Sequence, residues 1–80
     1  MISAMTRRPI EVETDGGAGP YIDIVLDQLD EVIRLFDSNA VPYWVEEEAL
    51  SMDGGPAVIT VNLRSKADPT MVQRLLDSIR

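Results

Sequence analysis

The sequence predicts an α+β domain in which four strands and two helices follow one another in the order ββαββα. Three observations support this fold class: two Asp-Gly-Gly turns, each between strand-like runs; an amphipathic helical stripe after each hairpin; and a match between the two helices. Such elements bury their apolar faces by packing in layers. We therefore expect a four-stranded, mainly antiparallel sheet with both helices on one face. Residues 9–80 are expected to form the single domain, preceded by a flexible N-terminal arm, residues 1–8.

The first hairpin is predicted by alternating apolar residues on both sides of Asp15-Gly16-Gly17. The strand-like runs are residues 9–14 and 21–26. The residues that share a face are Ile10, Val12 and Thr14 in the first run and Ile22, Ile24 and Leu26 in the second. Glycine after aspartate accepts the positive φ that tight hairpin turns need, so this pattern favours a β-hairpin.

The first helix is predicted to follow directly. Asp27 is its expected N-cap, and Asp30 adds negative charge near the helix start. Apolar residues then recur with helical spacing, at Leu29, Val32, Ile33 and Phe36. Ser38-Asn39, followed by Pro42, is expected to end the helix.

The second unit repeats this plan. Strand-like runs at 43–50 and 57–63 flank Asp53-Gly54-Gly55. Asp68 is the expected N-cap of the second helix, with Pro69 at its first position, where a missing N–H costs nothing. The apolar stripe of this helix consists of Val72, Leu75, Leu76 and Ile79.

The two helices also match residue by residue. Residues 32–38 align with residues 72–78 at a constant offset of 40, and five of the seven positions are identical. The Asp-Gly-Gly turns and the order of the elements repeat as well. We interpret the chain as a duplicated ββα unit, with half-repeats at about 9–40 and 41–80.

The sheet face away from the helices is where we expect function. On the parity set by Ile22 and Ile59, the strand residues on that face are Tyr21, Asp23, Val25, Val58, Thr60 and Asn62. In the third strand we expect Tyr43 and Val45 to point toward the helices. Trp44, Glu46, Glu48 and Leu50 then point outward.

Composition excludes several classes of function. The chain has no cysteine and no histidine, so the commonest general base, metal ligand and thiolate nucleophile are missing. A net charge of −7 argues against binding to nucleic-acid phosphates. No apolar stretch approaches the roughly 20 residues that span a bilayer. We expect a cytoplasmic protein that is not an enzyme and has no cofactor, no nucleic-acid partner and no membrane partner.

The expected function is protein binding. Tryptophan is enriched at interface hot spots, and between residues 9 and 63 twelve acidic residues stand against one basic residue, Arg34. This pattern favours self-association, most simply as a homodimer that covers an open sheet edge, or binding to a basic partner surface. The candidate partner-binding residues are Trp44, Glu46, Glu48, Tyr21 and Thr60.

The alternative function is a small-ligand or divalent-cation sensor that uses the acidic third strand. In an extended strand Glu46 and Glu48 share a face, and Asp23 is the candidate third ligand. Hard cations take carboxylate oxygens as ligands.

Residues 35–45, which read Leu-Phe-Asp-Ser-Asn-Ala-Val-Pro-Tyr-Trp-Val, resemble the helix-to-strand step of small bacterial signal-transducing domains of ferredoxin-like character. In those domains a leucine-rich helix runs through a Gly-Ile-Pro type turn into an aromatic strand. The resemblance covers about fifteen residues of the chain, Ala40 stands at the glycine position, and ββαββα differs from the ferredoxin-like order βαββαβ. With no catalytic motif, it implies a regulatory or interaction module.

Overall fold

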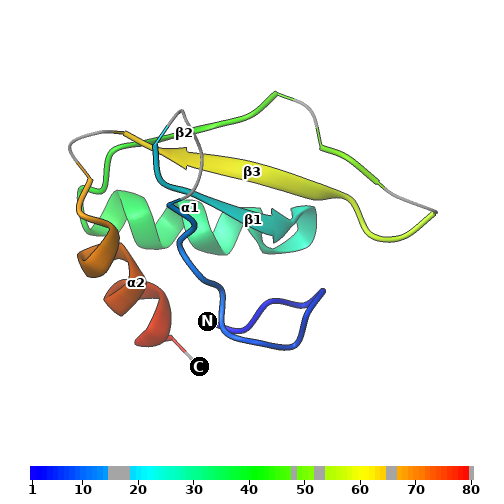
Figure 1. The fold of residues 1–80 in the computed structure, drawn as a ribbon, viewed down its shortest axis with the longest axis horizontal. Coiled ribbons are helices and arrows are strands. Elements are labelled where there is room, and N and C mark those ends of the chain that lie inside the picture. The colour runs from blue at the N-terminus through cyan, green and yellow to red at the C-terminus, as the bar shows by residue number, and fades with distance from the viewer. Residues whose placement is uncertain (15–18, 48, 52–53, 65–66, 80) are drawn as a thin grey trace.

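The computed structural model describes residues 1–14, 19–47, 49–51, 54–64 and 67–79. Its elements are β1 (Tyr21–Val25), the short 3₁₀ helix η1 (Leu26–Gln28), α1 (Leu29–Ser38), β2 (Tyr43–Val45), β3 (Val58–Leu63) and α2 (Pro69–Asp77). The strands form one antiparallel sheet in the order β1-β3-β2, and α1 runs along it (Figure 1). The predicted α+β class is confirmed, with three strands in the sheet.

One buried core joins the sheet to both helices. Alternate residues of β1 and β3 contribute to it, and each helix contributes two residues of its predicted stripe, four positions apart. The principal members are Ile22, Ile24, Ile59, Val61 and Leu63 from the sheet, and Val32, Phe36, Val72 and Leu76 from the helices. We call the sheet face that carries these residues the core face.

The opposite side, here called the open face, carries the residues that alternate with the core. The register places Trp44 opposite Asn62 and Asn62 opposite Tyr21. Since strand residues alternate between faces, Trp44 lies on the open face, and Tyr43 and Val45 lie on the core face. This is the arrangement that the sequence parity predicts.

The fourth strand and the ββα duplication are not confirmed. The expected strand 9–14 joins the sheet through one bridge, between Glu13 and Tyr21. Nearer its N-terminal end, this segment is bonded to α2. Gln73 Oε1 accepts from the Val12 N–H at 2.8 Å, and Gln73 Nε2 donates to the Ile10 carbonyl at 2.9 Å. These bonds draw residues 10–12 toward α2 and away from a full pairing with β1.

β2 ends at Val45, well before the expected end at residue 50. The Glu46 N–H still donates to the Thr60 carbonyl at 2.9 Å. The next pairing, however, joins Leu50 to Val58, so the register shifts by two residues. Extra residues on one side make a strand bow away from its partner, so the regular pairing predicted for this strand stops at Glu46. A shift of two residues does not change the face, however, and Leu50 lies opposite Val58 on the open face, as the sequence parity predicts. Glu48 lies outside the described residues.

The two helices begin differently. The predicted N-cap at Asp27 is wrong: that residue lies inside η1, and Gln28 precedes α1 without a side-chain capping bond. The chain enters α1 from a preceding helical turn, so the N–H groups there need no cap. Asp68 is confirmed as the N-cap of α2, because its Oδ1 accepts from the Thr70 N–H at 2.9 Å and Pro69 follows it.

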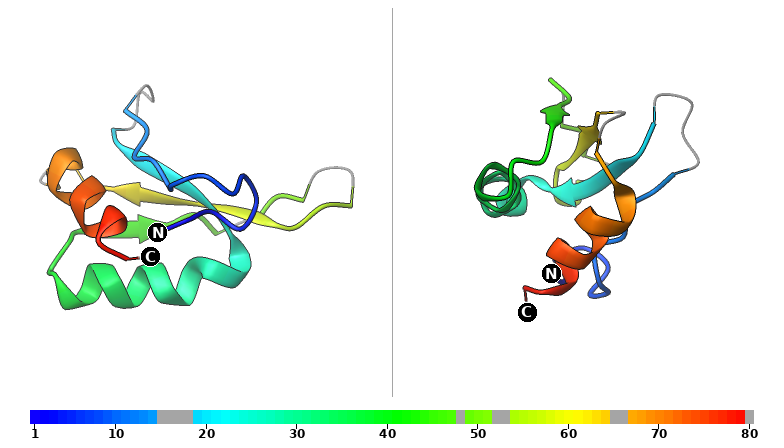
Figure 2. Two further views of the ribbon diagram at one scale, coloured as in Figure 1. Left: turned by 90° about the horizontal axis from the view of Figure 1, so that it is seen from below. Right: turned by 90° about the vertical axis from the view of Figure 1, so that its left-hand side faces the viewer.

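The N-terminal residues, expected as an arm ahead of the domain, fold back against it (Figure 2). A bridge joins Ile2 to Pro9, and the Ser3 N–H donates to the Arg8 carbonyl at 2.8 Å. The side chains of Met1 and Ile10 lie in the buried core. The segment thus forms a loop whose tip, around Met5, is exposed.

Candidate protein-interaction surface

β2 forms an outer edge of the sheet, at the top of the molecule in Figure 1. Pro42 and Glu46 bond through their backbones to the β3 side, at 3.2 and 2.9 Å. Residues of an antiparallel strand alternate between bonding the neighbouring strand and facing away from it. The backbone N–H and C=O groups of Tyr43 and Val45 therefore point to the outer edge, where none of the described strands lies.

Trp44 projects from this edge strand on the open face, with 45% of its surface exposed. Its cross-strand neighbour Asn62 is buried, and Asn62 Nδ2 donates to Glu46 Oε1 at 2.9 Å. This bond holds the Glu46 carboxylate close to the indole. Tyr21, half-buried, continues the row on β1. An exposed indole beside an ordered polar pair matches the composition of interface hot spots.

The next row of the open face contains Glu46, Thr60 and Asp23. Thr60 lies between the two acids, and its hydroxyl donates to Asp23 Oδ1 at 2.5 Å. Because strands lie about 5 Å apart, the backbones of Glu46 and Asp23 are separated by about 10 Å. Within the described part of the chain, no three acidic, histidine or cysteine side chains come together as a metal site would require. The alternative cation site therefore gains no support from these residues.

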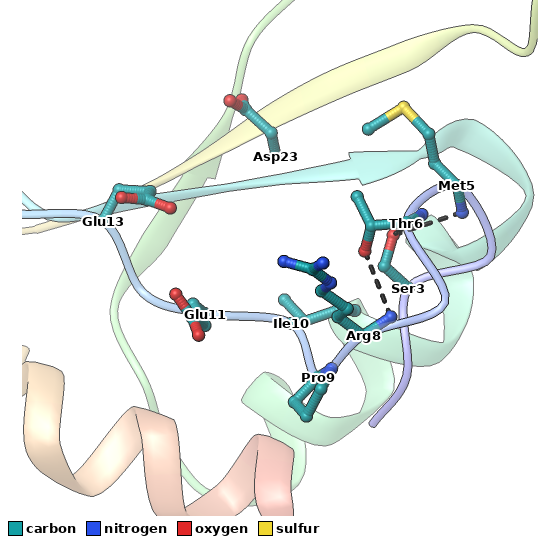
Figure 3. A pocket seen from close by; sticks show the side chains of 9 residues that line it. All are labelled: Ser3, Met5, Thr6, Arg8, Pro9, Ile10, Glu11, Glu13 and Asp23. Carbon is teal, nitrogen blue, oxygen red and sulfur yellow. Dashed lines mark hydrogen bonds between the residues drawn. The ribbon is translucent and has the colours of Figure 1, made fainter.

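Two adjoining pockets flank this row and share Met5 and Asp23. The first, of about 500 Å³, lies between the N-terminal loop, the segment around Glu11 and Glu13, and β1 (Figure 3). The second, of about 400 Å³, lies over the end of the sheet. Its lining comprises Met5, Asp23, Leu50, Gly55, Pro56, Val58 and Thr60. The open face thus passes from a charged region, which holds Glu11, Glu13 and Asp23 together with Arg8, to an apolar one.

On the core face, Tyr43 ties β2 to α1. Its hydroxyl donates to Asp37 Oδ1 at 2.9 Å, and its ring lies 5.7 Å from that of Phe36, centroid to centroid. Burial raises the pKa of the Tyr43 phenol above its ordinary value, and the hydrogen bond and the negative charge of Asp37 raise it further. The folded state therefore favours the neutral phenol over the phenolate.

Of the five residues predicted to bind a partner, Trp44, Glu46, Tyr21 and Thr60 lie on one face of the sheet. Glu48 lies outside the described residues. Sequence reasoning missed Met5, and it missed that Ile33 is only half-buried and does not pack against the core among the described residues. The polar run after Met5 was typical of an arm, and the stripe containing Ile33 predicted burial for all of its members.

No protein-family model matches the chain, and neither a curated protein nor a solved structure matches it. Within the described residues, neither helix has the length and apolar character needed to cross a bilayer.

Proposed function

We propose that the protein is a small, non-enzymatic interaction or regulatory module that binds another protein through the open face and the β2 edge of its sheet. The observation that carries this proposal is the placement of Trp44. A large aromatic side chain lies exposed on an edge strand, beside a hydrogen-bonded carboxylate and with outward-pointing backbone groups next to it. Binding sites on proteins commonly combine these three features.

Charge favours a partner with a basic surface. Glu46 and Asp23 lie on the open face, and Glu11 and Glu13 line the adjoining pocket, where they outnumber Arg8. A second copy approaching on the same face would bring these carboxylates together, and like charges across an interface oppose binding. A homodimer is the other form of the proposal, and the same experiment measures it.

The test compares capture of partner proteins by the wild-type chain and by two variants with equally exposed positions. Trp44→Ser removes the indole from the open face. Met71→Ser is the matched control, because Met71 is 43% exposed and belongs to α2 and not to the sheet. We expect the wild type and Met71→Ser to capture the same protein and Trp44→Ser to lose it. Size-exclusion chromatography with light scattering gives the oligomeric state of each chain.

Two outcomes contradict the proposal. One is a chain that stays monomeric at high concentration and captures no protein. The other is a captured protein that Trp44→Ser and Met71→Ser retain equally well. A dimer that Trp44→Ser dissociates and Met71→Ser does not would support self-association instead of a basic partner.

A further inference from the structure

We infer that the β2 edge is a docking site for an extended segment of a partner, with apolar and basic side chains in alternation, which adds to the sheet as an antiparallel fourth strand. This inference rests on the proposed function and names the chemistry of the partner at one part of the surface.

The β2 edge of the sheet is free of any described strand. The outward N–H and C=O groups of Tyr43 and Val45 present four backbone hydrogen-bonding positions to an incoming strand. Extended peptides bind to such edges through main-chain hydrogen bonds, and side chains at alternate positions supply specificity. Because β3 is already antiparallel to β2, an antiparallel addition continues the pattern of the sheet.

The two edges of the sheet differ in what lies beside them. At the β1 edge, the extended segment of this chain pairs through Glu13 and leans on Gln73 of α2. At the β2 edge, α1 lies alongside instead, since Asp37 bonds Tyr43. Ile33, one helical turn before Asp37, is on the same side of α1. Ile33 therefore lies beside the free β2 edge, in the way that Gln73 lies beside the β1 edge and the segment that covers it.

Ile33 specifies an apolar contact. Leu29 and Leu35 pack against the buried core, whereas half-buried Ile33 does not belong to that packed group among the described residues. A strand added to β2 has one row of side chains on the core face, above α1. Apolar residues in that row would cover Ile33 and the adjacent part of Tyr43.

The other row of the added strand lies on the open face, next to Trp44 and Glu46. Glu47 follows directly in sequence and is exposed. Lysine or arginine in this row is complementary to the carboxylates and can also stack on the indole. The backbone of Arg64 bonds Pro42 at the opposite end of β2. Because Arg64 is positively charged and like charges repel, we expect the basic residues of the partner to lie at the other end, near Glu46.

The experiment titrates the full chain with blocked synthetic hexapeptides that contain no aromatic residue, and follows the fluorescence of Trp44, the single tryptophan. One peptide alternates Val with Lys, and a second alternates Val with Glu. Two further Val/Lys peptides carry N-methyl groups, either on the Val or on the Lys nitrogens. In the inferred pairing the Val nitrogens face β2 and the Lys nitrogens face away.

We expect saturable binding of the Val/Lys peptide and at least tenfold weaker binding of the Val/Glu peptide. Methylation of the Val nitrogens should weaken binding at least tenfold, and methylation of the Lys nitrogens should have little effect. Glu46→Lys should reverse the preference between Lys and Glu peptides, and Ile33→Ser should weaken both. Met71→Ser should bind as the wild type does. The amide signals of Tyr43 and Val45 should shift on binding.

The inference is overturned if no peptide binds, or if N-methylated Val peptides bind as tightly as the parent peptide. In that case Trp44-dependent capture of a protein would leave the proposed function intact and place the contact on the open face alone. Loss of both peptide binding and Trp44-dependent capture would overturn both proposals.

Discussion

At the scale of a single residue, Tyr43 makes the protein less stable as the pH rises into the alkaline range. Its pKa is raised above the ordinary value of 10.0 by burial, by the hydrogen bond to Asp37 and by that carboxylate's charge. The folded state therefore keeps the phenol proton that the unfolded chain releases near pH 10. The stability linked to this group is complete below that pH and falls as the pH rises through the folded-state pKa.

We predict that Tyr43→Phe removes the loss of stability that the wild type shows as its phenol ionises at alkaline pH. At neutral pH the variant should be less stable by about 0.5–1 kcal/mol, the net contribution of one hydrogen bond. Above pH 10 the difference from the wild type should shrink. Urea unfolding at a series of pH values from 7 to 11 measures both effects, with Asp37→Asn as a second variant that lowers the phenol pKa. An equal stability gap at pH 7 and pH 11 would contradict the linkage.

At the scale of an element, the end of α1 contains a residue with an unfavourable backbone conformation. The Val41 N–H donates to the Phe36 carbonyl at 2.9 Å, and the Ala40 N–H donates to the Asp37 carbonyl at 3.3 Å. This is the Schellman arrangement, in which the residue after the C-cap is left-handed and usually glycine. Ala40 has φ 55° at that position, where an L residue with a Cβ is strained.

Ala40→Gly is therefore expected to stabilise the protein. Relief of the left-handed strain outweighs the greater entropy of glycine in the unfolded chain, and we expect a gain of about 0.5–1 kcal/mol, or several degrees in Tm. Ser38→Gly, two residues earlier at the last position of α1, is the control: it has no positive φ to relieve, and glycine there should destabilise by up to about 0.5 kcal/mol. Thermal unfolding followed by circular dichroism measures both. A lower Tm for Ala40→Gly would show that the turn does not strain alanine.

The elements also show which parts of the fold local sequence can predict. Asp68-Pro69 and the buried stripe residues Val32, Phe36, Val72 and Leu76 depend on near neighbours, so short-range patterns predicted them correctly. Asp27 had the right residue type for a cap, but η1 supplies the preceding turn. The bowed segment after Glu46 and the bonds from Gln73 to residues 10 and 12 depend on distant contacts. Periodicity contains no information about such contacts, and the exposed position of Met5 depends on them too.

At the scale of the whole molecule, the two outer edges of the sheet differ. At the β1 edge lies the N-terminal segment, which Gln73 bonds at residues 10 and 12. Residues 33 and 73 occupy matching positions in the helices, and they are one of the two mismatches in that alignment. With glutamine, α2 binds the backbone of residues 10–12; with isoleucine, α1 offers no such bonds beside the β2 edge, where none of the described strands lies. The sequence similarity thus covers the helical stripes, whereas the difference at this position separates the closed edge from the open one.

We predict that Gln73→Ala loosens the N-terminal segment without disturbing the sheet. The Val12 N–H and the Ile10 carbonyl would lose their partner, at a cost of about 1–2 kcal/mol. Hydrogen exchange should accelerate at residues 10–13 and at Tyr21, while the amides of β3 keep their protection relative to global stability. Arg74→Ala, the neighbouring exposed residue on α2, should leave these rates unchanged. Uniform acceleration across β1, β2 and β3 would instead mean that Gln73 supports the whole core, and the covered edge would then not be a separable feature of the fold.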